Sequence, residues 1–240
     1  MSRASRLVPR ALLALAFVAG CASAPPPPVV EAPPPPPPPK LAPKMGMTSE
    51  LGSIDEDATT KTFAGLRSSL MRCYTSGQQR IEFLSGDVKF YFRVKPDGST
   101  HWVFLEQSTL GDRATEKCML DIIMMARWPQ PDGGEAEVHQ GLGFDAPGGV
   151  RPPTDWSSDR LSAALAKAST SVNACKQHGK GTFSATAYIH PQKGGGSVLA
   201  AGAAPSTKEA DADVDCLVGV LQKLKVPSPG SYAAKVFFTL

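Results

Sequence analysis

The sequence predicts an α+β fold built from two tandem modules, each with a small, largely antiparallel sheet that carries helices on one face. The prediction rests on an internal repeat. Cys73 and Cys118 are 45 residues apart, Cys175 and Cys216 are 41 residues apart, and in each copy a Pro-x-Pro begins 11 residues after the second cysteine. The element order expected in each copy is helix, strand, strand, helix, strand.

The first module is expected at residues 57–147. Leu66, Leu70 and Met71 are expected to share one face of a helix that ends near Cys73. Residues 87–94 alternate between apolar and polar side chains, which predicts a strand with one buried face. Residues 95–98 (Lys-Pro-Asp-Gly) predict a hairpin turn, because glycine accepts a positive φ.

The second helix of this module is expected to carry Cys118, Ile122 and Met125 on one stripe and to stop before Pro129. The neighbouring Trp128 is expected to be a core residue that closes this helix against the sheet. A tryptophan at this place could instead serve as a partner contact.

The second module is expected at residues 155–240 and is divergent in sequence. Leu161 and Leu165 predict its first helix, and residues 182–189 predict the strand that follows. Residues 194–196 (Gly-Gly-Gly) predict a hairpin tip, since the remaining residues of a phosphate-binding loop are absent. A module of this size has a marginal core and would benefit from a covalent cross-link.

Residues 1–20 have the pattern of a signal peptide: a basic start and then an apolar run over residues 11–20 that is too short to span a bilayer. The ending Val18-Ala-Gly-Cys21 resembles the lipobox of bacterial lipoproteins. The resemblance implies cleavage before Cys21 and attachment of acyl chains such as palmitate, which would anchor the protein to a membrane. The alternative is an ordinary signal peptide in which the cysteine is incidental.

Residues 21–56 are expected to form a tether between the lipidated cysteine and the first module. Pro25–Pro28 and Pro33–Pro39 cannot form helices or sheet ladders, so polyproline II is expected. About 20 such residues at roughly 3.1 Å each would span on the order of 60 Å. The alternative is a binding site for a proline-recognising module.

The formal charge of +3 comes from Arg3, Arg6 and Arg10 in the predicted signal peptide. The remainder of the chain is balanced between basic and acidic residues. A balanced composition argues against a nucleic-acid-binding protein, whose footprint is a basic surface.

The cysteines that remain after Cys21 fall two in each module. In an oxidising compartment the simplest pairing is Cys73 with Cys118 and Cys175 with Cys216. Crossed pairing, or four free buried thiols, remain alternatives. A zinc site is disfavoured because no Cys-x-x-Cys spacing occurs.

No cofactor, metal ligand or catalytic residue is expected from the sequence. None of the four histidines is placed four residues from another or lies in a His-Glu-x-x-His motif. Asp211, Asp213 and Asp215 imitate the opening of a calcium loop, but Cys216 and Gln222 occupy the positions where glycine and glutamate are needed. These aspartates are better explained as the start of a helix, where acids favour the positive end of the dipole.

The first copy resembles the AgmX/PglI C-terminal domain, a family that occurs in envelope and gliding-motility proteins of myxobacteria and is similar to the C-terminal domain of TonB. The second copy keeps the cysteines and the two prolines but lacks the tryptophan. The following segments of the first copy carry the resemblance: Cys73-Tyr74, Val94–Gly98, Gln107–Leu110, Cys118–Leu120, Arg127–Pro129, Pro131–Gly134 and Gly143-Phe144.

The resemblance implies a TonB-like fold for each module and a non-catalytic interaction domain of the cell envelope. TonB-type transducers keep an N-terminal membrane helix, whereas cleavage before Cys21 would remove it here, so passive binding or scaffolding is expected rather than energy transduction. The expected partners are envelope proteins, linked to motility or other envelope machinery. Ala22 favours the outer membrane over the inner one, so the expected location is the outer membrane, facing the periplasm.

An unpaired strand at the edge of a small sheet can accept an extended segment of a partner. Residues 137–144 and 235–240 are the candidate edges. Two alternatives remain at this point. One is an enzyme or ligand-binding lipoprotein with a site between the modules, which would show a cleft with perturbed ionisable groups. The other is a spacer that binds the cell wall.

Overall fold

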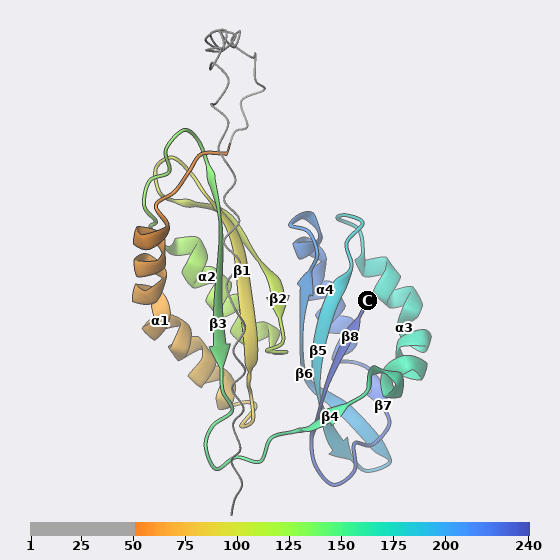
Figure 1. Cartoon of the computed structure of the whole chain (residues 1–240). Helices are drawn as coiled ribbons and strands as arrows, with labels where there is room; N and C mark the ends of the chain where they lie inside the picture. The colour runs from red at the N-terminus through yellow and green to blue at the C-terminus, as the bar shows by residue number, and fades with distance from the viewer. Residues whose placement is uncertain (1–50) are drawn as a thin grey trace, which may run out of the picture. The chain divides into compact units, whose positions relative to one another are not determined.

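The computed structural model describes residues 51–240 (Figure 1), and within them four α-helices and eight strands in two sheets confirm the α+β class. The predicted signal peptide, the lipid anchor at Cys21 and most of the tether fall on residues 1–50 and lie outside the described residues. Within the described range, no helix has the length and apolar character needed to cross a bilayer.

The first half of the described chain forms a three-stranded antiparallel sheet in the order β2-β1-β3. The order of elements along the chain is the predicted helix, strand, strand, helix, strand. The first helix continues beyond Cys73, where the sequence placed its end, and the predicted position of Met71 on the face of the buried Leu70 is wrong, because Met71 is exposed. The elements are α1 (Glu56–Gln78), β1 (Gly86–Val94), β2 (Thr100–Ser108), α2 (Arg113–Met125) and β3 (Ala136–Phe144).

Local sequence explains where these elements begin and which face they bury. Asp55 caps α1 by accepting a hydrogen bond from the Ala58 amide at 2.9 Å, and Asp112 caps α2 through the Thr115 amide at 3.3 Å. In β1 the apolar residues of the predicted alternation all face the core, where α1 and α2 cover them. They are Val88, Phe90, Phe92 and Val94, each no more than 1% exposed.

The end of α2 is closed by Trp128, as predicted. The indole is buried, packs on Phe92 with ring centroids 4.4 Å apart, and donates a hydrogen bond from Nε1 to the Thr100 hydroxyl at 2.9 Å. The expected position of Met125 on the buried stripe is wrong. Met125 is the last residue of α2 and is 75% exposed, because the chain turns into an extended conformation at Ala126.

The second half forms a five-stranded sheet in the order β4-β8-β5-β6-β7, rather than the three-stranded sheet expected. Two short 3-10 helices, Ser158–Leu161 and Glu209–Asp213, precede its α-helices. The elements are β4 (Thr154–Trp156), α3 (Ser162–Cys175), β5 (Phe183–Gln192), β6 (Gly195–Pro205), α4 (Val214–Leu221), β7 (Lys225–Val226) and β8 (Ala234–Thr239).

The two sheets share a topology once the short strands are set aside. In each, the first strand of a hairpin is central: β1 lies between β2 and β3, and β5 lies between β6 and β8. The added strands are short. β4 pairs with β8 in parallel, and β7 pairs with the start of β6. The internal repeat therefore appears in the strand order as well as in the cysteine spacing.

Each half has a core of its own, and the halves meet where β2 and α2 pack against β6 within one compact unit. Residues 200–205 of β6 are all buried, and alanine and glycine predominate among them, which lets the first half approach closely. Four side chains of the second half belong to the core of the first: Tyr188, Ala200, Ala204 and Ala233. The sheet of the second half is thus buried on both faces.

Candidate functional site

The outer edge of β3 is unpaired among residues 51–240, because β3 forms ladder hydrogen bonds with β1 alone. The Glu135 carbonyl accepts a hydrogen bond from the Gly52 amide at 2.6 Å, so the backbone groups of Glu135 point away from β1. Alternate residues of a strand direct their amide and carbonyl groups to the same side. Glu137, His139 and Gly141 therefore present free backbone donors and acceptors at this edge.

The second candidate edge is only partly free. The sequence proposes residues 235–240 as an edge, but β4 pairs with Ala234, Lys235 and Val236. The prediction is wrong for that part of β8. The short strand β4 was missed because three residues carry too little periodicity to be recognised.

A groove of about 500 Å³ runs beside the edge of β3. Residues 136–140 of β3 form one wall, and Gly52–Ile54 with the first turns of α1 form the other. The groove follows the free edge for five residues, which is enough to seat a short extended segment.

The solvent face of the same sheet carries aromatic and charged side chains in cross-strand rows. Tyr91 of β1 lies between Phe104 of β2 and His139 of β3, and its ring stacks on the imidazole with centroids 4.2 Å apart. In the next row Arg93 lies between Trp102 and Glu137, with its guanidinium 5.4 Å from the centre of the indole.

Two ion-pair groups fix this face. The Arg93 guanidinium binds Glu137 at 2.5 Å and Glu135 at 3.6 Å. Glu106 accepts hydrogen bonds from Lys89 and His139, each at 3.0 Å. The hydrogen bond from Arg93 lowers the pKa of Glu137. Burial opposes the ionisation of Glu106, but its two basic neighbours outweigh it, so the pKa of Glu106 also lies below its usual range.

Burial raises the pKa of Tyr91 to about 12, and the nearby Glu137 carboxylate adds to the effect. The phenol is therefore neutral at physiological pH, while the carboxylates around it are ionised. This combination suits recognition by stacking and hydrogen bonding.

A cleft of about 400 Å³ separates this face from the loop at residues 206–209 in the second half. Tyr91, Trp102 and Phe104 line one side of the cleft. Lys208 enters from the other side, with Nζ 5.7 Å from the centre of the Trp102 ring. The other lining residues are polar or charged, so the cleft is more polar than a usual small-molecule pocket and offers both ring stacking and hydrogen bonds.

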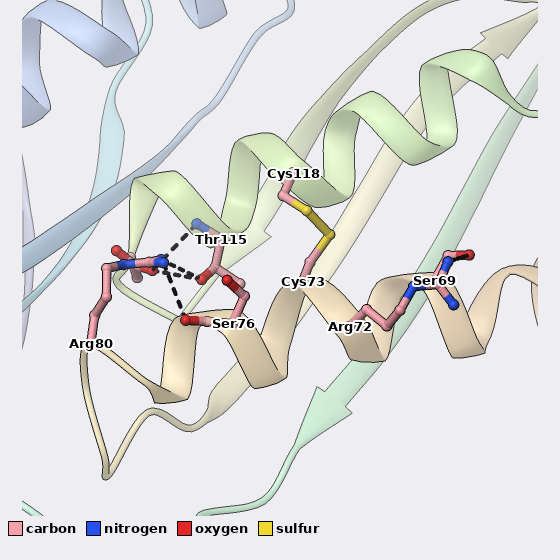
Figure 2. The surroundings of a disulfide bond; sticks show 8 residues. Ser69, Arg72, Cys73, Ser76, Arg80, Thr115 and Cys118 are labelled. Atoms are coloured by element: carbon pink, nitrogen blue, oxygen red, sulfur yellow. Dashed lines mark hydrogen bonds and ion pairs between the residues drawn. A yellow bond between two sulfur atoms is a disulfide. The ribbon is translucent and has the colours of Figure 1, made fainter.

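Both predicted disulfides are present, Cys73–Cys118 and Cys175–Cys216, with Cα–Cα distances of 5.8 and 5.5 Å. Figure 2 shows the first bond linking α1 to α2. Seven residues after Cys73, Arg80 reaches back to the start of α2, where its guanidinium binds the carboxylate of Asp112 at 2.5 Å. Disulfides persist in oxidising compartments, so these bonds indicate an extracytoplasmic domain.

The aspartates that resemble a calcium loop have another role. Asp213 accepts hydrogen bonds from the amides of Gln177 and His178 at 3.0 and 2.9 Å, and it binds the His178 ring at 2.7 Å. It ties the end of α3 to the start of α4. Asp213 is the N-cap residue of α4 and Asp215 lies in its first turn, so the helix-start explanation is confirmed for these two residues, although the Asp213 side chain caps no amide of α4. Residues 51–240 contain no cluster of three or more acidic, histidine or cysteine side chains arranged to hold a metal ion.

The boundary between the halves contains charged groups whose burial sequence reasoning missed. Lys235 and the Tyr188 hydroxyl both donate to the Ser85 carbonyl, at 2.6 and 3.1 Å. Burial lowers the pKa of Lys235 to about 8. Glu116 of α2 is completely buried here, and burial raises its pKa to about 7. Only the packing of the second half reveals these environments.

Comparisons with protein-family models, curated proteins and solved structures give no match for this chain. The fold and the disulfides define an α+β extracytoplasmic domain. Its function must be argued from the β3 edge, the aromatic face and the sequence pattern.

Proposed function

We propose that this chain is a non-catalytic, lipid-anchored protein of the cell envelope that binds another envelope protein by adding an extended segment to β3. The observation that carries the proposal is the free β3 edge, where Glu137, His139 and Gly141 direct backbone groups outward beside a groove. Backbone hydrogen bonds along such an edge supply affinity, and pockets beside it supply specificity.

The sequence pattern supports the cellular setting. The lipobox-like ending at Cys21 supports a lipid anchor, and Ala22 supports the outer membrane, facing the periplasm. The resemblance of the first half to the AgmX/PglI and TonB C-terminal domains supports a role in motility or other envelope machinery. The predicted anchor is tested by Cys21→Ser, which is expected to abolish acyl labelling and to release the protein from membranes.

The edge is tested with a pair of substitutions at Gly141. Proline removes the outward amide, whereas alanine keeps it, and a Cβ at this position would meet only the Val88 carbonyl at 3.6 Å. A photo-crosslinking residue placed at His139 in living cells is expected to form an adduct with an envelope protein. Gly141→Pro should abolish the adduct and Gly141→Ala should preserve it.

The same crosslinker at Asp121, an exposed residue of α2, is the positional control and should give no such adduct. An adduct at His139 that survives Gly141→Pro, or no adduct at all, would contradict strand addition. Thermal unfolding of both Gly141 variants separates loss of binding from loss of folding.

A second candidate function is ligand binding in the cleft between the halves. The specific observation that favours it is the composition of the cleft. Three aromatic side chains, Tyr91, Trp102 and Phe104, lie beside two carboxyl groups with lowered pKa values, Glu106 and Glu137. Candidate envelope ligands can be screened by tryptophan fluorescence. A signal that Trp102→Phe abolishes, while the buried Trp128 and Trp156 remain, would support the cleft. A signal that survives would exclude it.

A further inference from the structure

The groove beside β3 is lined by the acidic residues Glu56 and Glu137 and by no lysine or arginine. The segments that carry and flank its walls, residues 51–60 and 131–140, contain no lysine or arginine either. They contain the following acidic residues: Asp55, Glu56, Asp57, Asp132, Glu135 and Glu137. The first four are exposed to solvent.

Contacts within the protein neutralise only part of this charge. Arg93 pairs with Glu135 and Glu137 from the neighbouring strand. Asp55 accepts the capping hydrogen bond at the start of α1. The positive end of a helix dipole is equivalent to about half a charge, so it offsets only a fraction of three successive acids. Glu56, an exposed residue that lines the groove, therefore leaves a negative charge at this wall, and Asp57 lies beside it in the same helical turn.

We propose that the segment added to β3 is basic, with lysine or arginine at alternate positions; this inference rests on the function proposed above. Side chains of an added strand alternate between the two faces of the sheet. Those on the helix side face the start of α1, where Glu56 lines the groove. Alternate basic residues would thus meet the acidic wall, while the backbone pairs with β3.

The same charge disfavours a second copy of this chain as the occupant. Pairing of two β3 edges would bring two acidic walls together. Like charges placed face to face destabilise a strand pair. The groove thus selects a basic partner and also opposes self-association through this edge.

The test uses the full-length protein and two synthetic peptides as probes. One peptide alternates lysine with valine and threonine, and the other has glutamine in place of every lysine. Backbone amide NMR shifts report binding and its location, even when affinity is weak. At low salt the lysine peptide is expected to bind about tenfold more tightly, because it forms several solvated ion pairs with the acidic wall.

The double variant Glu56→Gln/Asp57→Asn is expected to remove most of this preference. Asp121→Asn removes an exposed acid elsewhere on the protein and is expected to leave the preference unchanged. Raising the salt concentration to about 0.5 M should also lower the affinity of the lysine peptide until it approaches that of the glutamine peptide.

The outcomes separate the two proposals. Equal binding of both peptides, abolished by Gly141→Pro, would overturn the basic partner and leave strand addition standing. Binding that Gly141→Pro does not affect would overturn strand addition. A lysine preference reduced equally by Glu56→Gln/Asp57→Asn and by Asp121→Asn would show general charge attraction, and would also overturn the proposal. Concentration-dependent dimerisation through the amides of residues 137–141 would identify a second copy as the occupant instead.

Discussion

Glu116 of α2 lies directly against Gly202 of β6, across the boundary between the two halves. A Cβ at position 202 would be 2.3 Å from Oε1 of Glu116. This oxygen accepts a hydrogen bond from the Ser108 hydroxyl at 2.6 Å, and Oε2 has no hydrogen-bond partner within residues 51–240. A carboxyl group is thus enclosed between the halves where only glycine leaves room for it.

Gly202→Ala is expected to destabilise the protein by about 1–3 kcal/mol, the usual cost of adding atoms to a packed interior. Chemical denaturation measures the change in the free energy of unfolding. Gly219→Ala is the matched control, because a Cβ at Gly219 meets nothing within 4 Å. In helix α4 that alanine should be neutral or stabilise by up to about 1 kcal/mol. Equal effects of the two alanines would contradict the close contact.

The burial of Glu116 predicts a pH-dependent stability. Burial raises its pKa in the folded protein from the ordinary value of 4.5 to about 7, so the folded state holds this proton more tightly than the unfolded state. The associated stability is complete below about pH 4.5 and is lost as the pH rises to about 7. The shift corresponds to a loss on the order of 3 kcal/mol.

Glu116→Gln keeps the shape of the side chain and removes the titration. The free energies of unfolding at pH 5 and pH 8 should therefore differ less in the variant than in the parent. Arg113 and Asp112 also act on this carboxyl group, the first lowering its pKa and the second raising it, and both remain in the variant. An unchanged difference between the two pH values would show that the ionisation of Glu116 does not contribute to the pH dependence of stability.

Sequence reasoning predicts the elements whose signals are local. The alternation in residues 87–94 identifies β1 and its buried face, and the cysteine spacing identifies both cross-links, because each signal is complete within one module. The two-residue strand β7 and the three-residue strand β4 were not predicted, because segments this short carry too little periodicity to be recognised.

The candidate site could be predicted only in outline. Residues 137–144 are an edge strand, as the sequence proposes. Alternation also implies that Tyr91 and Arg93 share a face, but the loop at residues 206–209 that turns this face into a cleft comes from the other half. The burial of Glu116 follows from packing between halves. An acid near the start of a helix already has a local explanation, so the sequence alone does not indicate that Glu116 is buried between the halves.

Tyr188→Phe tests the hydrogen bonds that join the halves. The Tyr188 hydroxyl accepts from the Ser85 amide at 3.3 Å and donates to the Ser85 carbonyl at 3.1 Å. Its removal is expected to cost about 1–2 kcal/mol, because the amide of Ser85 loses this partner in a partly buried place. Tyr232→Phe removes an exposed hydrogen bond to Arg151 and should cost less than about 0.5 kcal/mol. Equal losses in the free energy of unfolding for the two variants would show that the contact between Tyr188 and Ser85 does not stabilise the protein.

Removal of either disulfide is expected to destabilise the protein by roughly 4 kcal/mol, because each bond closes a loop of similar length in the unfolded chain. The sequence separations are 45 and 41 residues, so the two losses should be nearly equal. The variants Cys73→Ala/Cys118→Ala and Cys175→Ala/Cys216→Ala, each in a Cys21→Ser background, isolate the two bonds. Denaturation gives the free energies, and intact mass with and without reductant shows that each variant retains one bond. A thiol that alkylates in the unreduced, denatured parent would contradict the pairing, and strongly unequal losses would show that native packing outweighs the entropy of the unfolded chain.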